Sequence, residues 1–134
     1  MRAVFDTNVL IAALVFPGRQ PESAFRAAVS GRIGLVTSPP LLAEFGRVLT
    51  GKFGWEDHMV EAAVGQVARI GTVVRPTARV SVIDEDPADD LVLEAVQEGG
   101  VDAIVSGDRH LLRLGTWREI RVLRVTDLMK ELER

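Results

Sequence analysis

Residues 3–8 read AVFDTN, and the predicted fold is built around this segment. Its apolar part ends at Asp6, and helix-like sequence follows directly. A short apolar run bounded by turn residues is typical of a buried strand. In open parallel sheets, ligands bind just beyond the carboxyl ends of the strands, so we expect the Asp6 carboxylate at such an edge. The alternative is that Asp6 only begins a turn, with Thr7 or Asn8 capping the next helix.

Short apolar segments alternate with helical patterns along the chain. We expect strands at 3–5, 33–36, 72–74, 102–105 and 120–125, and helices at 9–16, 21–30, 39–50, 56–70, 86–98 and 126–134, with a short helical turn at 111–114. This alternation predicts an α/β fold in which helices cover both faces of a parallel sheet through right-handed crossovers. Residues 80–83 are apolar and fit either a small extra strand or a covered loop.

Length and composition restrict the class of protein. The chain has 134 residues, of which 47% are hydrophobic and 26% charged, and this suits one globular domain at 1–134. It has no cysteine, which excludes disulfides and thiolate metal sites. We see neither an apolar run of membrane-spanning length nor a signal-peptide pattern, so we expect a cytoplasmic protein. The net charge of −3 does not indicate a nucleic-acid binder, although arginines between 109 and 124 could form a local basic surface.

Acidic residues are predicted to gather at one edge of this sheet. Asp6 follows the first strand, and Asp108 follows the fourth. Glu44 lies on the helix after the second strand, and Asp90 lies in the first turn of the helix before the fourth. In a doubly wound sheet such elements can converge on one crevice. Carboxylates gathered there repel one another unless one is protonated or a cation is bound. Ligands that are all oxygen indicate Mg²⁺ or Mn²⁺, which could promote attack of water on a phosphodiester.

Several of these acids also have a purely structural interpretation. Asp86 and Asp89 suit an ordinary helix N-terminus, where acidic residues interact favourably with the helix dipole, and we favour that interpretation for both. For Asp90 we favour the site. Glu44 could instead be a solvated helix position, and Asp108 could belong to a turn and nothing more.

The motifs, taken in order, resemble a PIN domain, and they are most similar to the PIN-family toxins of toxin–antitoxin pairs that are related to VapC. They are FDTNVL at 5–10, SP at 38–39 with Glu44, DPADD at 86–90 with LEA at 93–95, and IVSGD at 104–108. Together they cover the whole chain.

This resemblance implies a three-layer sandwich with a five-stranded parallel sheet of order 3-2-1-4-5. It also implies an endoribonuclease that depends on Mg²⁺ or Mn²⁺ and cleaves single-stranded RNA or RNA loops. The catalytic and metal-binding residues would be Asp6, Glu44, Asp90 and Asp108, with Asp86 as an additional candidate ligand. Hydrogen bonds to these carboxylates, or to a metal-bound water, would come from Thr7, Asn8, Ser38 and Ser106.

The residues after Asp108 differ from the pattern of many family members, which carry another acid or an asparagine there. Arg109 and His110 stand in that place, which leaves open whether one or two metal ions bind. Arg109 and Arg113 could grip flanking RNA phosphates, because the guanidinium fork suits phosphate oxygens. A solvated turn is the alternative for both arginines.

Partners also follow from the resemblance. It implies a homodimer and a small antitoxin protein whose peptide lies over the active-site groove. The apolar helices expected at 9–16 and 21–30 could supply such a surface.

Three other functions are weighed against the nuclease. An aspartyl-nucleophile phosphatase would carry a second acid two residues after Asp6, where Asn8 stands, together with a downstream lysine. A phosphorylated receiver domain would carry a lysine at the sheet edge, but the only lysines are Lys52 and Lys130. A catalytically silent PIN fold that serves as a binding or assembly module is the main alternative, and the complete acidic set argues against it.

Overall fold

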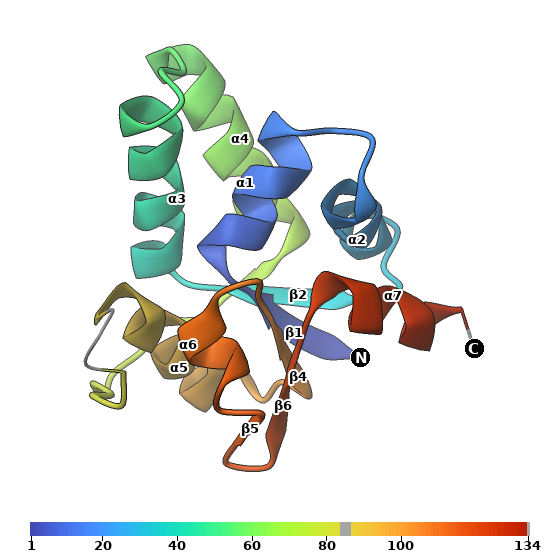
Figure 1. Ribbon diagram of the computed structural model, residues 1–134. Coiled ribbons are helices and arrows are strands. Elements are labelled where there is room, and N and C mark those ends of the chain that lie inside the picture. Colours follow the sequence, from blue (N-terminus) through green and yellow to red (C-terminus); the bar gives the residue numbers. More distant parts are fainter. Residues whose placement is uncertain (84–86, 134) are drawn as a thin grey trace.

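A mostly parallel sheet forms the middle layer of the molecule (Figure 1). The computed structural model describes residues 1–83 and 87–133. Within these residues the strand order is β3-β2-β1-β4-β6-β5. The strands are β1 (Arg2–Phe5), β2 (Gly34–Thr37), β3 (Thr72–Val73), β4 (Ala103–Val105), β5 (Thr116–Trp117) and β6 (Ile120–Leu123).

The predicted strand order is confirmed, with β6 as the fifth parallel strand. The structure adds β5, which pairs antiparallel with β6 at the edge of the sheet. Arg118 and Glu119 form the two-residue turn between them, and both have positive φ, at 51° and 69°. Positive φ at both central residues is the geometry of a type I′ hairpin, which usually carries Asn-Gly. The sequence has neither residue there, and so this hairpin was missed.

Helices cover both faces of the sheet, as expected. One face carries α1 (Thr7–Val15), α2 (Gln20–Val29), α3 (Pro39–Gly51), α4 (Asp57–Ile70) and α7 (Val125–Leu132), and the other carries α5 (Pro87–Gly99) and α6 (Arg109–Leu112) (Figure 1). Most of their ends lie within two residues of the predicted ones, which is the usual uncertainty of helix boundaries. None of the helices in the described part of the chain is long and apolar enough to cross a membrane.

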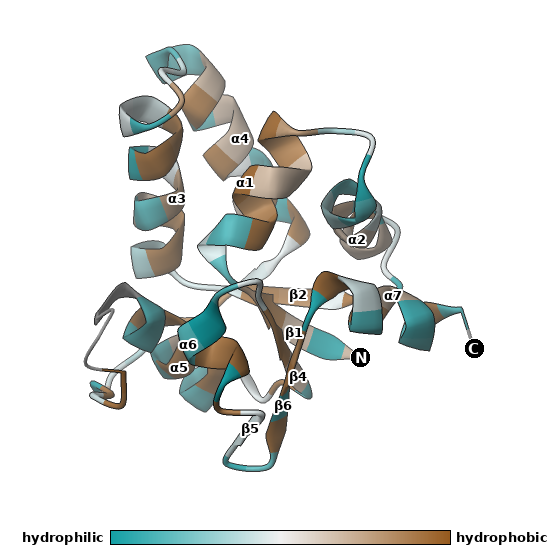
Figure 2. Cartoon of the chain, viewed as in Figure 1, coloured by the Kyte–Doolittle hydropathy of each residue, from teal (hydrophilic) through white to brown (hydrophobic). Residues whose placement is uncertain are grey.

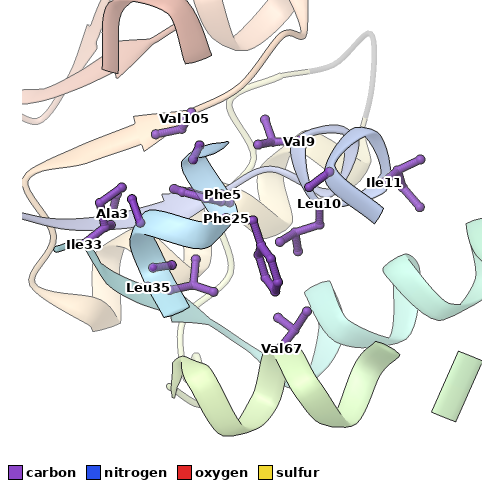
Figure 3. Close-up of a cluster of buried hydrophobic side chains, with 14 of the residues drawn as sticks. Ala3, Phe5, Val9, Leu10, Ile11, Phe25, Ile33, Leu35, Val67 and Val105 are labelled. Carbon is purple, nitrogen blue, oxygen red and sulfur yellow. The ribbon is translucent and has the colours of Figure 1, made fainter. Parts of the chain in front are cut away.

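Alternate strand residues feed two separate cores, because successive side chains of a strand point to opposite faces. Ala3 and Phe5 pack with α1, α2, α4 and α7, whereas Val4 packs with α5 and α6. Figure 2 shows the central strands mostly in the brown of hydrophobic residues. In Figure 3, Phe25 of α2 is directed toward Val67 of α4 within the first core.

Residues 80–83 form a loop and not a strand, and this loop is only partly covered. Ile83 is buried in the second core, whereas Val82 is exposed. One of the two alternatives left open by the sequence is therefore excluded.

The topology brings the N-termini of several helices to one edge of the sheet. Because β1, β2, β4 and β6 run parallel, their carboxyl ends share that edge. Helices α1, α3 and α6 begin within a few residues of the ends of β1, β2 and β4, and α5 leads back into β4. The acidic residues of the sequence motifs lie at or near these junctions.

Candidate active site

Four carboxylates line one cavity of about 310 Å³ at this edge of the sheet. They belong to Asp6, Glu44, Asp89 and Asp108. The cavity lies between α1 and α3 and extends along both helices away from the sheet. Its other lining residues are Thr7, Asn8, Ile11, Ala12, Phe16, Val48, Lys52 and Phe53.

The sheet and the first turn of α1 fix Asp6 in place. Its backbone N–H donates to the carbonyl of Val105 on β4 at 2.9 Å, and its own carbonyl accepts from the N–H of Val9 at 3.0 Å. The Asp6 side chain does not cap α1, although Asp6 stands at the N-cap position. Instead, Asp6 Oδ2 accepts a hydrogen bond of 2.7 Å from the Ser106 hydroxyl. The alternative of a simple turn residue therefore does not account for the Asp6 carboxylate, which is only 6% exposed.

Ser106 connects two of the four carboxyl residues. Its hydroxyl donates to Asp6 and accepts from the backbone N–H of Asp108 at 2.9 Å. Asp108 in turn caps α6, because its Oδ1 accepts from the N–H of His110 at 2.7 Å and of Leu111 at 3.4 Å. Asn8 Oδ1 accepts from the N–H of Gly107 at 3.4 Å and holds this turn against α1.

Helix α5 presents Asp89 to the cavity, and not Asp90. Asp89 is 4% exposed and lines the cavity with the other three carboxylates. Asp90 Oδ1 accepts from the backbone N–H groups of Val82 at 3.1 Å and Ile83 at 3.0 Å. Asp90 also lines a different cavity, of about 630 Å³, which it shares with residues 76–81. The structure thus reverses the placements expected from the sequence for these two residues.

The reversal has a simple geometric cause. Neighbouring residues of an α-helix point about 100° apart, so Asp89 and Asp90 cannot face the same way. Three, four and seven residues after Asp89 stand Val92, Leu93 and Val96, which are all buried. Asp89 therefore lies on the inward face of α5, and this apolar periodicity is the sequence signal that could have identified it.

The other predicted residues have different surroundings. Thr7 is 5% exposed, lines the cavity, and has no hydrogen-bond partner for its Oγ1 among the residues that the structure describes. Ser38 does not line the cavity, and its Oγ accepts from the N–H of Leu41 at 3.3 Å as the cap of α3. Ser38 therefore helps to position the helix that carries Glu44.

The two predicted phosphate-binding arginines lie outside the acidic cavity. Arg109 and Arg113 are both exposed. Arg113 lines a third cavity of about 180 Å³ together with His110, Leu114, Val82 and Ile83. The candidate ligand Asp86 lies outside the described residues.

The cavity suits a hard divalent cation in its chemistry. At the sheet edge it offers only oxygen donors, from four carboxylates, the Thr7 hydroxyl and the Asn8 amide. The positive ends of α1, α5 and α6 also favour negative charge there. Within residues 1–83 and 87–133, however, no three Asp, Glu, His or Cys side chains lie close enough together to hold a metal ion. The arrangement therefore fits Mg²⁺ bound by one or two carboxylates and water better than an all-protein cage.

Comparison with known families gives the classification. Residues 2–110 match the PIN domain family. The chain belongs to the PIN domain family. The matched residues run from β1 into α6 and include all four carboxylates of the cavity. No curated protein matches this PIN domain closely enough to count as a relative.

Solved structures with the same fold include VapC toxins. The complex VapBC2 from Rickettsia felis, bound to a DNA fragment from its promoter, matches with a TM-score of 0.62 and 11% identity over 92% of this chain and 98% of that one. PAE2754 from Pyrobaculum aerophilum matches with a TM-score of 0.58 and 15% identity, over 98% of this chain and 88% of that one. VapC20 from Mycobacterium tuberculosis, a sarcin–ricin loop cleaving toxin, matches with a TM-score of 0.57 and 17% identity, over 90% of this chain and 99% of that one. At these identities, the comparison shows the shared fold of this PIN domain.

Proposed function

We propose that this PIN domain is a metal-dependent endoribonuclease that cleaves single-stranded RNA or RNA loops and serves as the toxin of a toxin–antitoxin pair. The observation that carries the proposal is the set of four carboxylates around one cavity at the carboxyl edge of the sheet. The fold shared with VapC20, a sarcin–ricin loop cleaving toxin, supports the proposal that this chain also cleaves a loop.

In this proposal, one or two carboxylates of the cavity, together with water, would hold Mg²⁺ or Mn²⁺. Asp6, Asp89 and Asp108 are the candidate ligands, and Glu44 completes the acidic set. Asp89 takes the role that the sequence analysis assigned to Asp90. The bound cation would supply Lewis-acid activation of water and stabilise negative charge on the phosphate.

The protein's own side chains would orient the reacting groups and accept a proton. Ser106 keeps the Asp6 carboxylate in one orientation through its hydrogen bond. Thr7 lines the cavity beside Asp6, and its Oγ1 is buried without a hydrogen-bond partner among the described residues. A carboxylate of the cavity takes a proton from the attacking water as its oxygen bonds to phosphorus. The P–O bond of the leaving strand then breaks, and its oxygen is protonated from solvent.

The test is cleavage of a mixed RNA pool by the purified protein, with Mn²⁺ or Mg²⁺ against EDTA and with Asp6→Asn in parallel. We expect cuts that need both the metal and Asp6. Cleavage that persists in Asp6→Asn would refute the assignment of this cavity. An absence of cuts together with an absence of Mn²⁺ binding would favour the alternative, a catalytically silent PIN module.

We propose that the partners are an antitoxin protein and a second copy of the chain. A chain of the VapBC2 complex has the same fold, and this likeness supports the proposal that an antitoxin binds the chain. The helices that the sequence suggested for the partner surface bury most of their apolar residues inside the chain, including Val9, Leu10 and Phe25, and leave Phe16 and Val29 exposed. Size-exclusion chromatography with light scattering, for the chain alone and with a co-expressed antitoxin, tests both partners.

A further inference from the structure

The cavity that holds the four carboxylates has a second end of different character. Phe16, Phe53, Val48 and Ile11 line it with apolar surface, and Lys52 adds a positive charge. These residues come from α1, from α3 and from the segments that directly follow the two helices. Figure 1 shows α1 and α3 rising from the same edge of the sheet.

The aromatic residues of this end form a defined group. The rings of Phe16 and Phe53 meet edge to face, with centroids 5.9 Å apart and planes at 78°. The Lys52 ammonium lies 5.6 Å from the centroid of the Phe53 ring. Lys52 is also the C-cap of α3, where the negative end of the helix dipole stabilises a cation. Ring faces and a positive charge are therefore held side by side.

Phe16 is exposed to an unusual degree for its type. It is 47% exposed, and among the described residues it is the only aromatic one in the group of exposed large hydrophobic side chains. The others in that group are Met1, Val29, Met59 and Val82, and none of them lines the acidic cavity. Together with the partly exposed Phe53 and Val48, Phe16 forms apolar surface that adjoins the carboxylates of the same cavity. Contiguous apolar surface rimmed by polar residues indicates a binding site.

The two ends are separated by more than the size of one phosphate group. Glu44 and Lys52 are eight residues apart along α3, which corresponds to a rise of about 12 Å. A chemical group bound at the aromatic end is therefore different from the group bound at the carboxylates, and lies next to it. A polymer with a repeating unit can occupy both ends at once.

We infer that the aromatic end of the cavity binds a nucleotide of single-stranded RNA next to the one that is cut. Its base stacks on Phe16, and its phosphate contacts Lys52. This inference rests on the proposed nuclease function and identifies residues that select an unpaired strand. Unpaired bases stack on aromatic side chains whatever their identity. A phosphodiester chain alternates phosphate and base, which matches the adjacent cation and rings of this end.

The first experiment measures RNA binding without cleavage. A short, fluorescent single-stranded RNA is titrated into Asp6→Asn with and without the additional change Phe16→Ala. The RNA spans a mapped cut or, if no cut is found, consists of uridines only. We expect Phe16→Ala to raise the Kd about tenfold. Phe16→Leu, which keeps apolar bulk but has no ring, should behave like Phe16→Ala, and Met59→Ala should leave the Kd unchanged.

An abasic scan of the same RNA locates the contact. Removal of one base at the position beside the cut should weaken binding by the same factor as Phe16→Ala, and the two changes together should cost no more than either alone. Equal affinity of the Phe16→Ala variant, or an equal loss at every RNA position, would overturn the inference. A Phe16→Ala variant that binds RNA normally but no longer binds an antitoxin would assign this surface to a protein partner instead.

Lys52 has its own test in the salt dependence of binding. Each phosphate contact contributes about 0.7 to the slope of log Kd against log salt for a single strand. Lys52→Gln should lower that slope by about this amount, whereas Lys130→Gln on α7 should not. An unchanged slope in Lys52→Gln would remove the phosphate contact from the proposal. If the wild-type protein neither cuts RNA nor binds Mn²⁺, the nuclease proposal fails separately, because these binding measurements do not depend on cleavage.

Discussion

At the scale of single residues, two neighbouring aspartates show how position on a helix determines a role. Both are buried, so burial alone does not distinguish them. The Asp90 carboxylate accepts hydrogen bonds from the backbone N–H groups of Val82 and Ile83, whereas Asp89 lines the acidic cavity. The composition of the motif is the same for both residues, and only their direction around the α5 axis differs.

We therefore expect Asp89→Asn to impair cleavage and Asp90→Asn to impair stability. Asp89→Asn should abolish metal-dependent cleavage and leave the fold intact. Asp90→Asn should lower the free energy of unfolding by about 1–3 kcal/mol, because it weakens two hydrogen bonds to a charged acceptor. Its cleavage rate per folded molecule should stay near that of the wild type. Urea unfolding and cleavage assays on both variants check this, and loss of cleavage in a folded Asp90→Asn would contradict it.

Two fully buried serines give a second contrast. Ser106 bonds to a carboxylate of the cavity, whereas Ser38 caps a helix. Ser106→Ala should lower Mn²⁺ affinity about 10- to 100-fold, since a group that orients a ligand is lost. Ser38→Ala should cost about 0.5–2 kcal/mol of stability and leave Mn²⁺ affinity unchanged. Calorimetric titration with Mn²⁺ separates these results, and equal affinities in both variants would refute the role of Ser106.

At the scale of elements, the helices do more than cover the sheet. Asp6 stands at the N-cap of α1, Asp108 at the N-cap of α6, and Asp89 lies in the first turn of α5. Each carboxylate is therefore near the N-terminal, positive end of a helix dipole. The same geometry that begins three helices thus brings three acids of the cavity to one edge of the sheet.

The β5–β6 hairpin carries local backbone strain. Glu119 adopts a φ of 69°, a left-handed conformation that costs a residue with a Cβ atom about 1–2 kcal/mol. We expect Glu119→Gly to raise the free energy of unfolding by up to about 1 kcal/mol. Glu119→Ala removes the same charge but keeps the Cβ atom, so it should give no such gain. Urea denaturation of the two variants provides the comparison, and equal stabilities would argue against strain at this turn.

At the scale of the whole molecule, the cavity links metal binding to stability. A cation that binds only the folded state stabilises it by about 2.7 kcal/mol when its free concentration is one hundred times its Kd. We expect Mn²⁺ to raise the Tm of the wild type by several degrees, and EDTA to reverse this rise. Asp6→Asn should reduce the shift, whereas Asp127→Asn, a change on the exposed surface of α7, should not. An identical shift in all three proteins would place the metal outside this cavity.

The two helical layers and the positions of Asp6, Glu44 and Asp108 could be predicted from local patterns: apolar runs, helical periodicity, and the rule that parallel strands end at one edge. The order of the parallel strands was implied by the resemblance to the PIN domain. Other features depended on the tertiary structure. The antiparallel β5 lacks the usual turn residues, and the choice between Asp89 and Asp90 depends on the rotation of α5 against the sheet. The aromatic end of the cavity is assembled from residues more than thirty positions apart, Phe16 and Phe53, which meet only because α1 and α3 pack together. Local propensity does not encode such long-range contacts, since they arise when the apolar faces of separate elements are buried together.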